Sequence, residues 1–326
     1  MAGYIERITG LIPHTNKTVD IPLGGKSLII TGANGSGKTS LLRNAYEKTI
    51  VLIVNKKMGD LLLLRKRMSE VLSVLNDSSK IGTAVYDSAM RQRGQYQQAL
   101  ETLENGLQIS IPQNAQFSSK YENRQAQVLY FQDMRLSEIA EAKYAQGLQN
   151  VIDENRRAGY DQNVGSKLEQ HLVNLRTRRA LAIAEDYDQA LADAIENWFY
   201  QFEKNLKYLF QDDSLRLFFN SNKNKFSIEL KDNPPFTFQT LSAGYRAVLD
   251  IYADLLMRTE YFSISPTALE GVVFIDEAEA HLHISLQRLI LPFFVDSFPK
   301  IQFIVTTNSP YVLTSVRDIL VFDLGK

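Results

Sequence analysis

The sequence predicts an α/β fold with a mostly parallel core sheet, an N-terminal antiparallel β element and an inserted helical lobe. Three observations support this fold class. A glycine-rich loop stands between a buried strand and a helix near the N-terminus, strands and helices alternate from residue 272 to residue 323, and much of the span between them has helical spacing. Strands that alternate with helices favour a parallel sheet, because parallel neighbours need a long crossover connection.

The N-terminal segment predicts an antiparallel pair of strands that leads into a core strand. Apolar and polar residues alternate over residues 4–8 and again over residues 19–23. Such alternation is typical of half-buried strands. Residues 27–31 form an apolar, β-branched run, which we expect to be a buried strand.

The loop after this strand fits G-x-x-x-x-G-K-[ST], the pattern of a phosphate-binding loop. It reads GANGSGKT over residues 32–39, and helix-compatible residues follow it. Glycines let successive backbone N–H groups point at phosphates, and the helix N-terminus adds a partial positive charge. We expect Lys38 to reach the β- and γ-phosphates of ATP and the Thr39 hydroxyl to ligate Mg²⁺. The residues predicted to contact the nucleotide are Asn34, Gly35, Ser36, Gly37, Lys38, Thr39 and Ser40.

The middle of the chain predicts two helical regions separated by a loop and a short strand. Apolar residues recur at helical spacing from about residue 41 to residue 106, and the polar stretch 108–125 is expected to be a loop. Residues 128–131 read as a buried strand that ends at Gln132. Helical spacing returns over residues 137–210, with a helical hairpin whose turn lies near Gly159 and Gly165.

The last third of the chain predicts a β-hairpin followed by alternating helices and strands. Residues 215–219 and 226–230 alternate on either side of a polar turn, and a helix is expected over 243–258. The expected elements that follow are a strand at 272–275, a helix at 281–297, a strand at 301–305, a helix at 310–315 and a strand at 319–323.

Two of these strands end in residues suited to phosphate chemistry. The strand 272–275 ends in Asp276 and Glu277, and an open α/β sheet binds ligands at the carboxyl ends of its strands. Asp276 is expected to hold Mg²⁺ through water, and Glu277 to act as general base on the attacking water. The alternative is a strand that ends in solvated acids. The strand 301–305 is followed by the polar run TTNSP, where a side chain is expected to point at the γ-phosphate.

The residues TLSAGYR, 240–246, open the expected helix 243–258. They supply a serine at the helix N-cap and small residues after it, and a free helix N-terminus attracts anions. The alternative interpretation of this short pattern is an ordinary helix cap.

Taken together, the motifs GANGSGKT, LSAG, VVFIDEAEAHLH and IVTTNSP resemble the ATPase heads of ABC type, in the SMC, RecF and OLD group rather than the membrane transporters. The resemblance implies a P-loop NTPase fold of ABC type. The head would comprise residues 1–49, 126–136 and 214–326, with a helical insertion at 50–125 and a helical hairpin or arm at 137–213.

The same resemblance implies a site that is completed by a second copy of the chain. In this family two heads face each other, and each ATP lies between the P-loop of one head and the L-S-x-G helix of the other. Ser242 and Gly244 would then contact the γ-phosphate across an ATP-sandwich homodimer, or within a higher oligomer. Gln132 corresponds to the glutamine that the family places near Mg²⁺ and the γ-phosphate.

The chain departs from the family pattern at Asn308, where a histidine usually stands. Asparagine can hydrogen-bond a phosphate oxygen or the lytic water but cannot carry charge, so we expect slow hydrolysis or a long-lived ATP-bound dimer. His281 and His283 follow the two acids, with Ala278 where the family has proline. We interpret both histidines as structural or dimer-facing rather than as metal ligands.

Composition excludes several classes of function. The 326 residues contain no cysteine, which excludes a disulfide framework, a thiolate metal site and a cysteine nucleophile. Four scattered histidines argue against a histidine metal site, and no apolar run approaches the length that a membrane span needs. The net charge is −1, so no global basic field favours nucleic acid. We expect a cytoplasmic protein.

Two classes of function stay open. In the first, the chain is an ATPase subunit that regulates a separate effector, such as a nuclease, in prokaryotic anti-phage defence. In the second, it is a DNA-repair or chromosome-structure ATPase that binds DNA directly. Three basic clusters could contact phosphates or be solvated helix faces: Lys56 and Lys57; Arg65, Lys66 and Arg67; Arg176, Arg178 and Arg179. No nuclease motif is found in the sequence, so any nuclease activity is expected from a partner or from sequence outside this chain.

Overall fold

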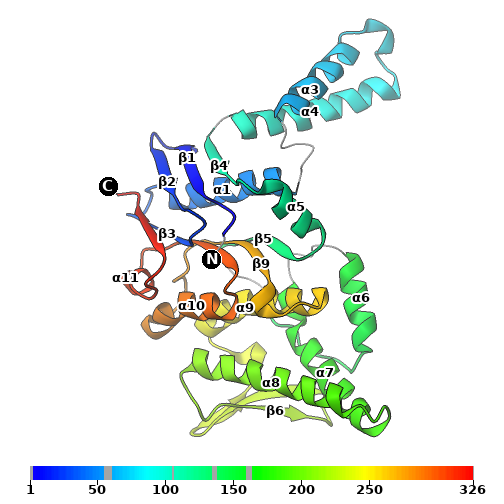
Figure 1. The fold of residues 1–326 in the computed structure, drawn as a ribbon, viewed down its shortest axis with the longest axis vertical. Helices are drawn as coiled ribbons and strands as arrows, with labels where there is room; N and C mark the ends of the chain where they lie inside the picture. Colours follow the sequence, from blue (N-terminus) through cyan, green and yellow to red (C-terminus); the bar gives the residue numbers. More distant parts are fainter. Residues whose placement is uncertain (1–2, 55–60, 105, 134–137, 159–163, 326) are drawn as a thin grey trace.

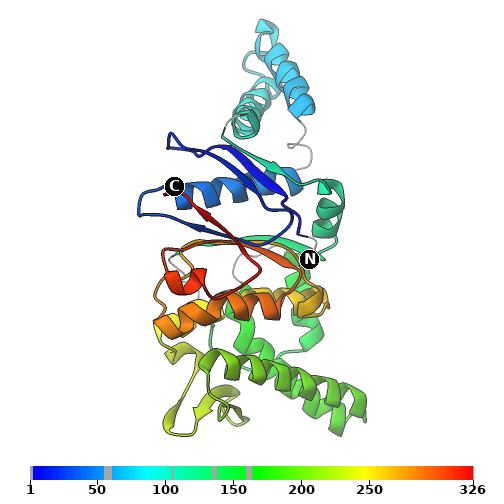
Figure 2. The same ribbon diagram turned by 60° about the vertical axis from the view of Figure 1, so that its left-hand side comes forward.

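A computed structural model describes residues 3–54, 61–104, 106–133, 138–158 and 164–325, and arranges them in layers around a parallel sheet (Figure 1). An antiparallel sheet with α1 (Lys38–Ile53) lies on one side of the parallel sheet. Most of the remaining helices and a second antiparallel sheet lie on the other side (Figures 1 and 2). The predicted α/β class with a mostly parallel core sheet is confirmed.

The parallel sheet has the strand order β11-β3-β10-β9-β5. Its strands are β3 (Leu28–Thr31), β5 (Ala126–Phe131), β9 (Glu270–Ile275), β10 (Ile301–Thr306) and β11 (Leu320–Asp323). Successive side chains of a strand point to opposite faces, so Val272 and Phe274 enter one hydrophobic core and Val273 and Ile275 enter the other. Because helices or strands cover both faces, the core strands read as continuous apolar runs.

The first core lies between the parallel sheet and the antiparallel sheet β2-β1-β4. Its elements are β1 (Arg7–Leu11), β2 (Thr18–Pro22), β4 (Leu107–Ser110), α1 and α5 (Asn114–Glu122). Helix α1 contacts β4, β5 and β10, so it joins the two sheets. The predicted N-terminal antiparallel pair is therefore confirmed as β1 and β2.

The loop predicted over 108–125 is wrong, because this stretch holds most of β4 and all of α5. The strand β4 extends the N-terminal sheet by pairing with β1, Ile109 opposite Ile8. In α5 only Phe117 and Tyr121 are large buried apolar residues, one helical turn apart. Two apolar side chains among polar neighbours give too weak a periodic signal to identify a helix.

The second core lies on the opposite face of the parallel sheet. Its helices are α6 (Leu148–Ala158), α7 (Leu168–Ala184), α8 (Gln189–Phe210), α9 (Ala243–Phe262) and α10 (Ile284–Ser297). Its strands are β6 (Arg216–Asn220), β7 (Lys225–Leu230) and β8 (Asn233–Phe236). The described chain also contains five short helical elements: η1 (Ser78–Lys80), η2 (Val164–Lys167), η3 (Phe238–Thr240), η4 (Pro266–Ala268) and α11 (Pro310–Leu313).

The predicted helical hairpin exists, but its turn lies elsewhere. Helices α7 and α8 pack against each other and are joined at residues 185–188, where Tyr187 has a left-handed φ of 53° and Asp188 caps α8. Gly165 instead lies in η2, where a Cβ would stand 2.7 Å from the backbone nitrogen of Asp254 in α9. Gly165 therefore permits a close approach rather than a turn, and Gly159 lies outside the described residues.

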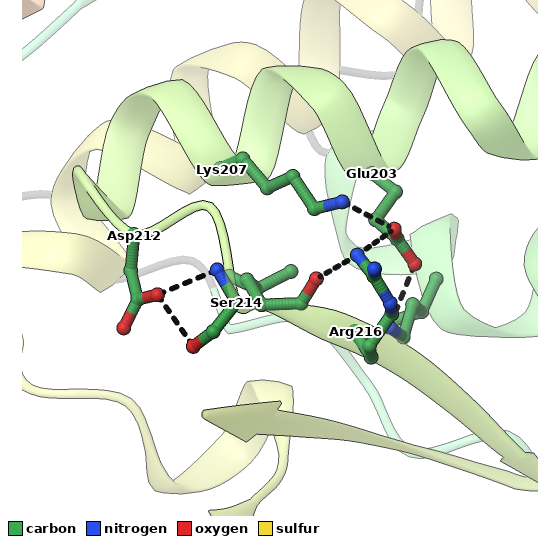
Figure 3. A network of polar contacts seen from close by, with 7 residues as sticks. Glu203, Lys207, Asp212, Ser214 and Arg216 are labelled. Atoms are coloured by element: carbon green, nitrogen blue, oxygen red, sulfur yellow. Dashed lines mark hydrogen bonds and ion pairs between the residues drawn. The ribbon is translucent and has the colours of Figure 1, made fainter. Parts of the chain in front are cut away.

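The end of α8 is tied to β6 by Glu203 (Figure 3). The Glu203 carboxylate accepts a hydrogen bond from the Leu217 backbone N–H at 3.0 Å and pairs with Lys207 at 2.9 Å and Arg216 at 3.3 Å. Burial alone would raise the pKa of Glu203, but these contacts outweigh it and lower the pKa. The confirmed hairpin of β6 and β7 is thereby fixed to the helical layer.

Helices α3 (Leu61–Leu75) and α4 (Ala84–Glu104) form a hairpin that projects away from the layers (Figure 2). Leu72, Ile81 and Val85 are exposed on it, by 38%, 63% and 56%. Lys56 and Lys57 precede this hairpin and lie outside the described residues. None of the helices in the described ranges is long and apolar enough to span a membrane.

Candidate functional site

The glycine-rich loop joins β3 to α1 at the carboxyl edge of the parallel sheet. Gly32, Gly35 and Gly37 have φ angles of 143°, 75° and 102°, a region that L-residues with side chains rarely adopt. At Gly37 a Cβ would also lie 3.0 Å from a methyl carbon of Thr15, in the turn between β1 and β2. The glycines of the motif are therefore required by the backbone of the loop.

The side chains of this loop fit a nucleotide phosphate. Lys38 is buried, and its ammonium group donates to the backbone carbonyls of Gly32 at 2.8 Å and Ala33 at 3.1 Å, curled over the loop. The Ser36 hydroxyl is buried without a hydrogen-bond partner in the described part of the chain. A buried hydroxyl without a partner is costly, and a phosphate oxygen would satisfy it. Asn34 and Gly35 are exposed at the loop, and Ser40 follows in α1.

Asp276 directly follows the strand β9 and is linked by a hydrogen bond to Thr39 of the glycine-rich motif. It is only 4% exposed, and its two carboxylate oxygens accept hydrogen bonds from the hydroxyl groups of Thr39 and Tyr130, each at 3.2 Å, and of Thr306. Burial, followed by the Asp276 charge, raises the pKa of Tyr130, so this phenol stays a proton donor. Thr39 and Asp276 thus supply the hydroxyl and carboxylate that Mg²⁺ takes beside a nucleotide.

Glu277 directly follows Asp276, and its backbone no longer has the conformation of the strand. Its φ is 43°, in the left-handed region that is uncommon for residues other than glycine. Burial and the nearby charges of Asp276, Asp133 and Glu279 raise its pKa. A carboxylate with a raised pKa is a stronger base than an ordinary glutamate, as removal of a proton from water requires.

Asn308 lies beside the glycine-rich loop, although 274 residues separate it from Asn34. Its side-chain amide donates to the Asn34 side chain at 3.1 Å. The turn that carries it is held by Glu279, whose carboxylate accepts from the Asn308 backbone N–H at 2.5 Å and the Thr307 hydroxyl at 2.6 Å. Glu279 therefore fixes the distance between the strand ends of β9 and β10.

Gln132 reaches the same edge of the sheet. It directly follows β5, whose last residue Phe131 pairs with Ile275, so Gln132 emerges beside Asp276. The side chain of Gln132 is exposed. This position is consistent with a contact to Mg²⁺ or the γ-phosphate, although its side chain makes no hydrogen bond within the described residues.

Ser242 and Gly244 lie at the start of α9 and are not brought to the glycine-rich loop of the same chain. Ser242 is exposed, and its side chain makes no capping hydrogen bond. Gly244 is buried, and a Cβ there would lie 3.1 Å from the backbone oxygen of His281. Arg246, one turn further along, pairs with Glu138 at 2.7 Å. The segment is therefore packed in place, with its serine hydroxyl open to solvent.

His281 and His283 belong to the turn between β9 and α10. His281 has a left-handed φ of 64°, and His283 is the N-cap of α10, where its ring contacts the Ser285 hydroxyl at 3.2 Å. No group of three or more His, Cys, Asp or Glu side chains within the described ranges is arranged to hold a metal ion.

The structure therefore brings most of the predicted site residues together. The glycine-rich loop, Asp276, Glu277, Gln132 and Asn308 meet at one sheet edge, while Ser242 and Gly244 lie apart. Sequence reasoning missed three supporting residues there, Tyr130, Thr306 and Glu279, because hydrogen bonds between distant segments leave no pattern in the sequence. The P-loop follows β3 and the two acids follow β9, with β10 between these strands, and this arrangement is typical of nucleotide-hydrolysing heads.

The chain belongs to a family of ATPases. Residues 63–314 match the family described as "AAA domain, putative AbiEii toxin, Type IV TA system". The resemblance to an ATPase head, drawn from the motifs, is confirmed at the level of this ATPase family.

Two curated relatives match shorter segments. The chain is 38% identical over 89 residues to "Retron Ec83 probable ATPase" of Escherichia coli, which is 26% of this chain and 16% of the relative. It is 31% identical over 108 residues to "Septu protein PtuA" of Bacillus thuringiensis, which is 31% of this chain and 27% of the relative. Among solved structures, the "SMC head domain from Thermotoga maritima" covers 98% of this chain, and 94% of its own length is matched, at 11% identity and a TM-score of 0.41.

Proposed function

We propose that this ATPase forms a head-to-tail homodimer around two ATP molecules and uses dimerisation to regulate a separate effector in anti-phage defence. The dimer is supported by the positions of the motifs within one chain. The phosphate loop and both acids share one sheet edge, whereas the serine of the L-S-A-G segment is exposed and caps nothing in its own chain. A second head would bring that serine to the γ-phosphate.

In this proposal each residue at the sheet edge has a defined task. Lys38 leaves the carbonyls of Gly32 and Ala33 and pairs with the β- and γ-phosphates. Thr39 and Asp276 hold Mg²⁺, which neutralises phosphate charge when bound. Glu277 accepts the proton of the attacking water, and Asn308 orients that water or a γ-phosphate oxygen. Asn308 stays neutral throughout, so turnover is slow.

The exposed surface of the α3–α4 hairpin is an argument for a separate protein partner. The hairpin projects from the head (Figure 2), and Leu72, Ile81, Val85 and Met90 are exposed on it. An open groove between the helices is lined by apolar residues, among them Val71, Val74 and Val85, and by polar residues, among them Arg67 and Glu70. The similarity to the retron ATPase and to the Septu protein PtuA supports a role in anti-phage defence.

Direct DNA binding is supported less well. In the cluster on α7, Arg176 and Arg179 pair with Glu196 at 2.8 and 2.9 Å, and Arg178 pairs with Asp186. Two carboxylates of the same chain thus offset most of the charge of these three arginines, so the cluster presents a reduced positive charge to phosphates.

The test of the dimer uses Glu277→Gln. This substitution keeps the size and hydrogen-bonding capacity of the side chain but removes the base. The variant should bind ATP, hydrolyse it at least about tenfold more slowly and accumulate as a dimer, measured by light scattering after size exclusion. ADP should leave it monomeric, because the γ-phosphate supplies the contacts that favour closure.

The matched control is Glu277→Gln combined with Ser242→Arg, which retains the phosphate loop but changes the trans contact. This control should bind ATP and stay monomeric. If Glu277→Gln also stays monomeric with saturating ATP and Mg²⁺, the ATP-sandwich dimer is wrong.

A further inference from the structure

The hydroxyl of Thr306 lies between the two carboxylate residues of the site. Thr306 is the last residue of β10 and is 0% exposed, and it begins the polar run TTNSP. Its hydroxyl donates a hydrogen bond to a carboxylate oxygen of Asp276 and accepts one from the backbone N–H of Glu277 at 2.8 Å. A hydroxyl has one proton and two lone pairs, so both bonds form at once.

Thr306 also holds the residue after the two acids. The backbone N–H of Ala278 donates to the Thr306 carbonyl at 3.0 Å. Three consecutive residues, from Asp276 to Ala278, are therefore fixed by one residue of the neighbouring strand. The register of the sheet sets this contact, because Val305 pairs with Ile275 and Thr306 pairs with Ile30.

The backbone of Glu277 depends on this contact. Its φ of 43° is sparsely populated by residues with side chains, and such conformations persist where the surroundings hold them. The Thr306 hydroxyl is the acceptor that holds the Glu277 N–H in this turn. Without it, Glu277 can relax toward an ordinary strand conformation, which would redirect its carboxylate.

We propose that Thr306 is a positioning residue for ATP hydrolysis, because its hydroxyl fixes the carboxylate of Asp276 and the backbone of Glu277 relative to each other. Its side chain is buried, and it acts through these two residues. Small displacements of a reacting group reduce the rate strongly while leaving the binding groups in place. Removal of the hydroxyl should therefore lower kcat more than it weakens ATP binding.

The experiment compares Thr306→Ala with Thr306→Ser. Both variants lose the methyl group, and only serine keeps a hydroxyl. Thr306→Ala should lower kcat at least about tenfold with KM for ATP changed less than about threefold, whereas Thr306→Ser should keep kcat within about threefold of the wild type. Nucleotide affinity from calorimetry shows that each variant is folded.

Thr259→Ala is the matched control. Thr259 is also 0% exposed, and its hydroxyl donates to the Leu256 carbonyl at 2.7 Å within α9, away from both acids. It should lose stability in thermal unfolding and keep kcat. Equal kcat in Thr306→Ala and Thr306→Ser, whether both are normal or both reduced, would overturn the proposal. If Thr306→Ala is too unstable to assay, Thr306→Val, which keeps the volume of the side chain, is compared with Thr306→Ser by the same criteria.

Discussion

Asp276 is a buried carboxylate that accepts hydrogen bonds from three hydroxyl groups. Thr39, Tyr130 and Thr306 all donate to it, and each comes from a different strand or helix. A buried charge is expensive unless hydrogen bonds or ions compensate it. The three hydrogen bonds therefore offset part of the cost of burying this carboxylate.

Lys38→Ala tests the phosphate loop itself. In the proposed site Lys38 pairs with the β- and γ-phosphates, so ATP affinity should fall at least about tenfold, which is about 1.4 kcal/mol. Isothermal calorimetry measures the change directly. Lys26→Ala, at an exposed turn before β3, is the control and should bind ATP normally. Unchanged affinity in Lys38→Ala would show that the nucleotide binds elsewhere.

Glu203→Gln tests the attachment of the β6–β7 hairpin at the scale of elements. The amide keeps an acceptor for the Leu217 N–H but loses the charge that pairs with Lys207 and Arg216. The free energy of unfolding at pH 7 should fall by about 1 kcal/mol, measured by urea titration. The exposed Glu185→Gln is the control and should change it little.

The stability difference between the wild type and Glu203→Gln should depend on pH. The contacts lower the pKa of Glu203 from its ordinary value of 4.5, so its contribution is complete above pH 4.5 and is lost as the pH falls through the lowered value. The difference between wild type and Glu203→Gln should therefore be constant between pH 7 and about pH 5.5 and shrink below about pH 4.5. A difference that grows on acidification would contradict the assigned contacts.

Elements whose apolar residues lie together in sequence were predicted well. All five strands of the parallel sheet follow from short apolar runs, because both faces are buried. The strand β8 was missed since it contains Pro234 and Pro235, which lack the N–H that a strand donates. It forms because it pairs at the edge of its sheet, beyond β7.

Some residues of the candidate site could also be predicted from the sequence, and others could not. The glycine-rich loop, Asp276 and Glu277 could be predicted because each stands at a fixed position in a local motif. Thr306 and Glu279 could not, because their roles depend on the register between β9 and β10 and on the turns that follow these strands. Propensity and spacing carry no information on such pairings.

At the scale of the whole molecule, the parallel sheet separates two cores that contribute different parts of the site. The core with α1 supports the phosphate loop, while the core with α9 supports the L-S-A-G segment. Movement of one layer relative to the other would change the position of Ser242 with respect to a facing head. In the proposed dimer, such a shift would link closure on ATP to the projecting hairpin.

The most direct test of the account mixes two inactive chains. Lys38→Ala loses its own nucleotide but keeps Ser242, and Ser242→Arg keeps its phosphate loop but loses the trans contact. In a mixed dimer the ATP held by the second chain faces the intact serine of the first, so one complete site forms. The mixture should recover about a quarter of wild-type ATPase activity, since about half the dimers are mixed and each has one of two sites. A Ser242→Arg chain that is as active alone as the wild type, or a mixture with no more activity than its separate components, would contradict a site shared between two chains.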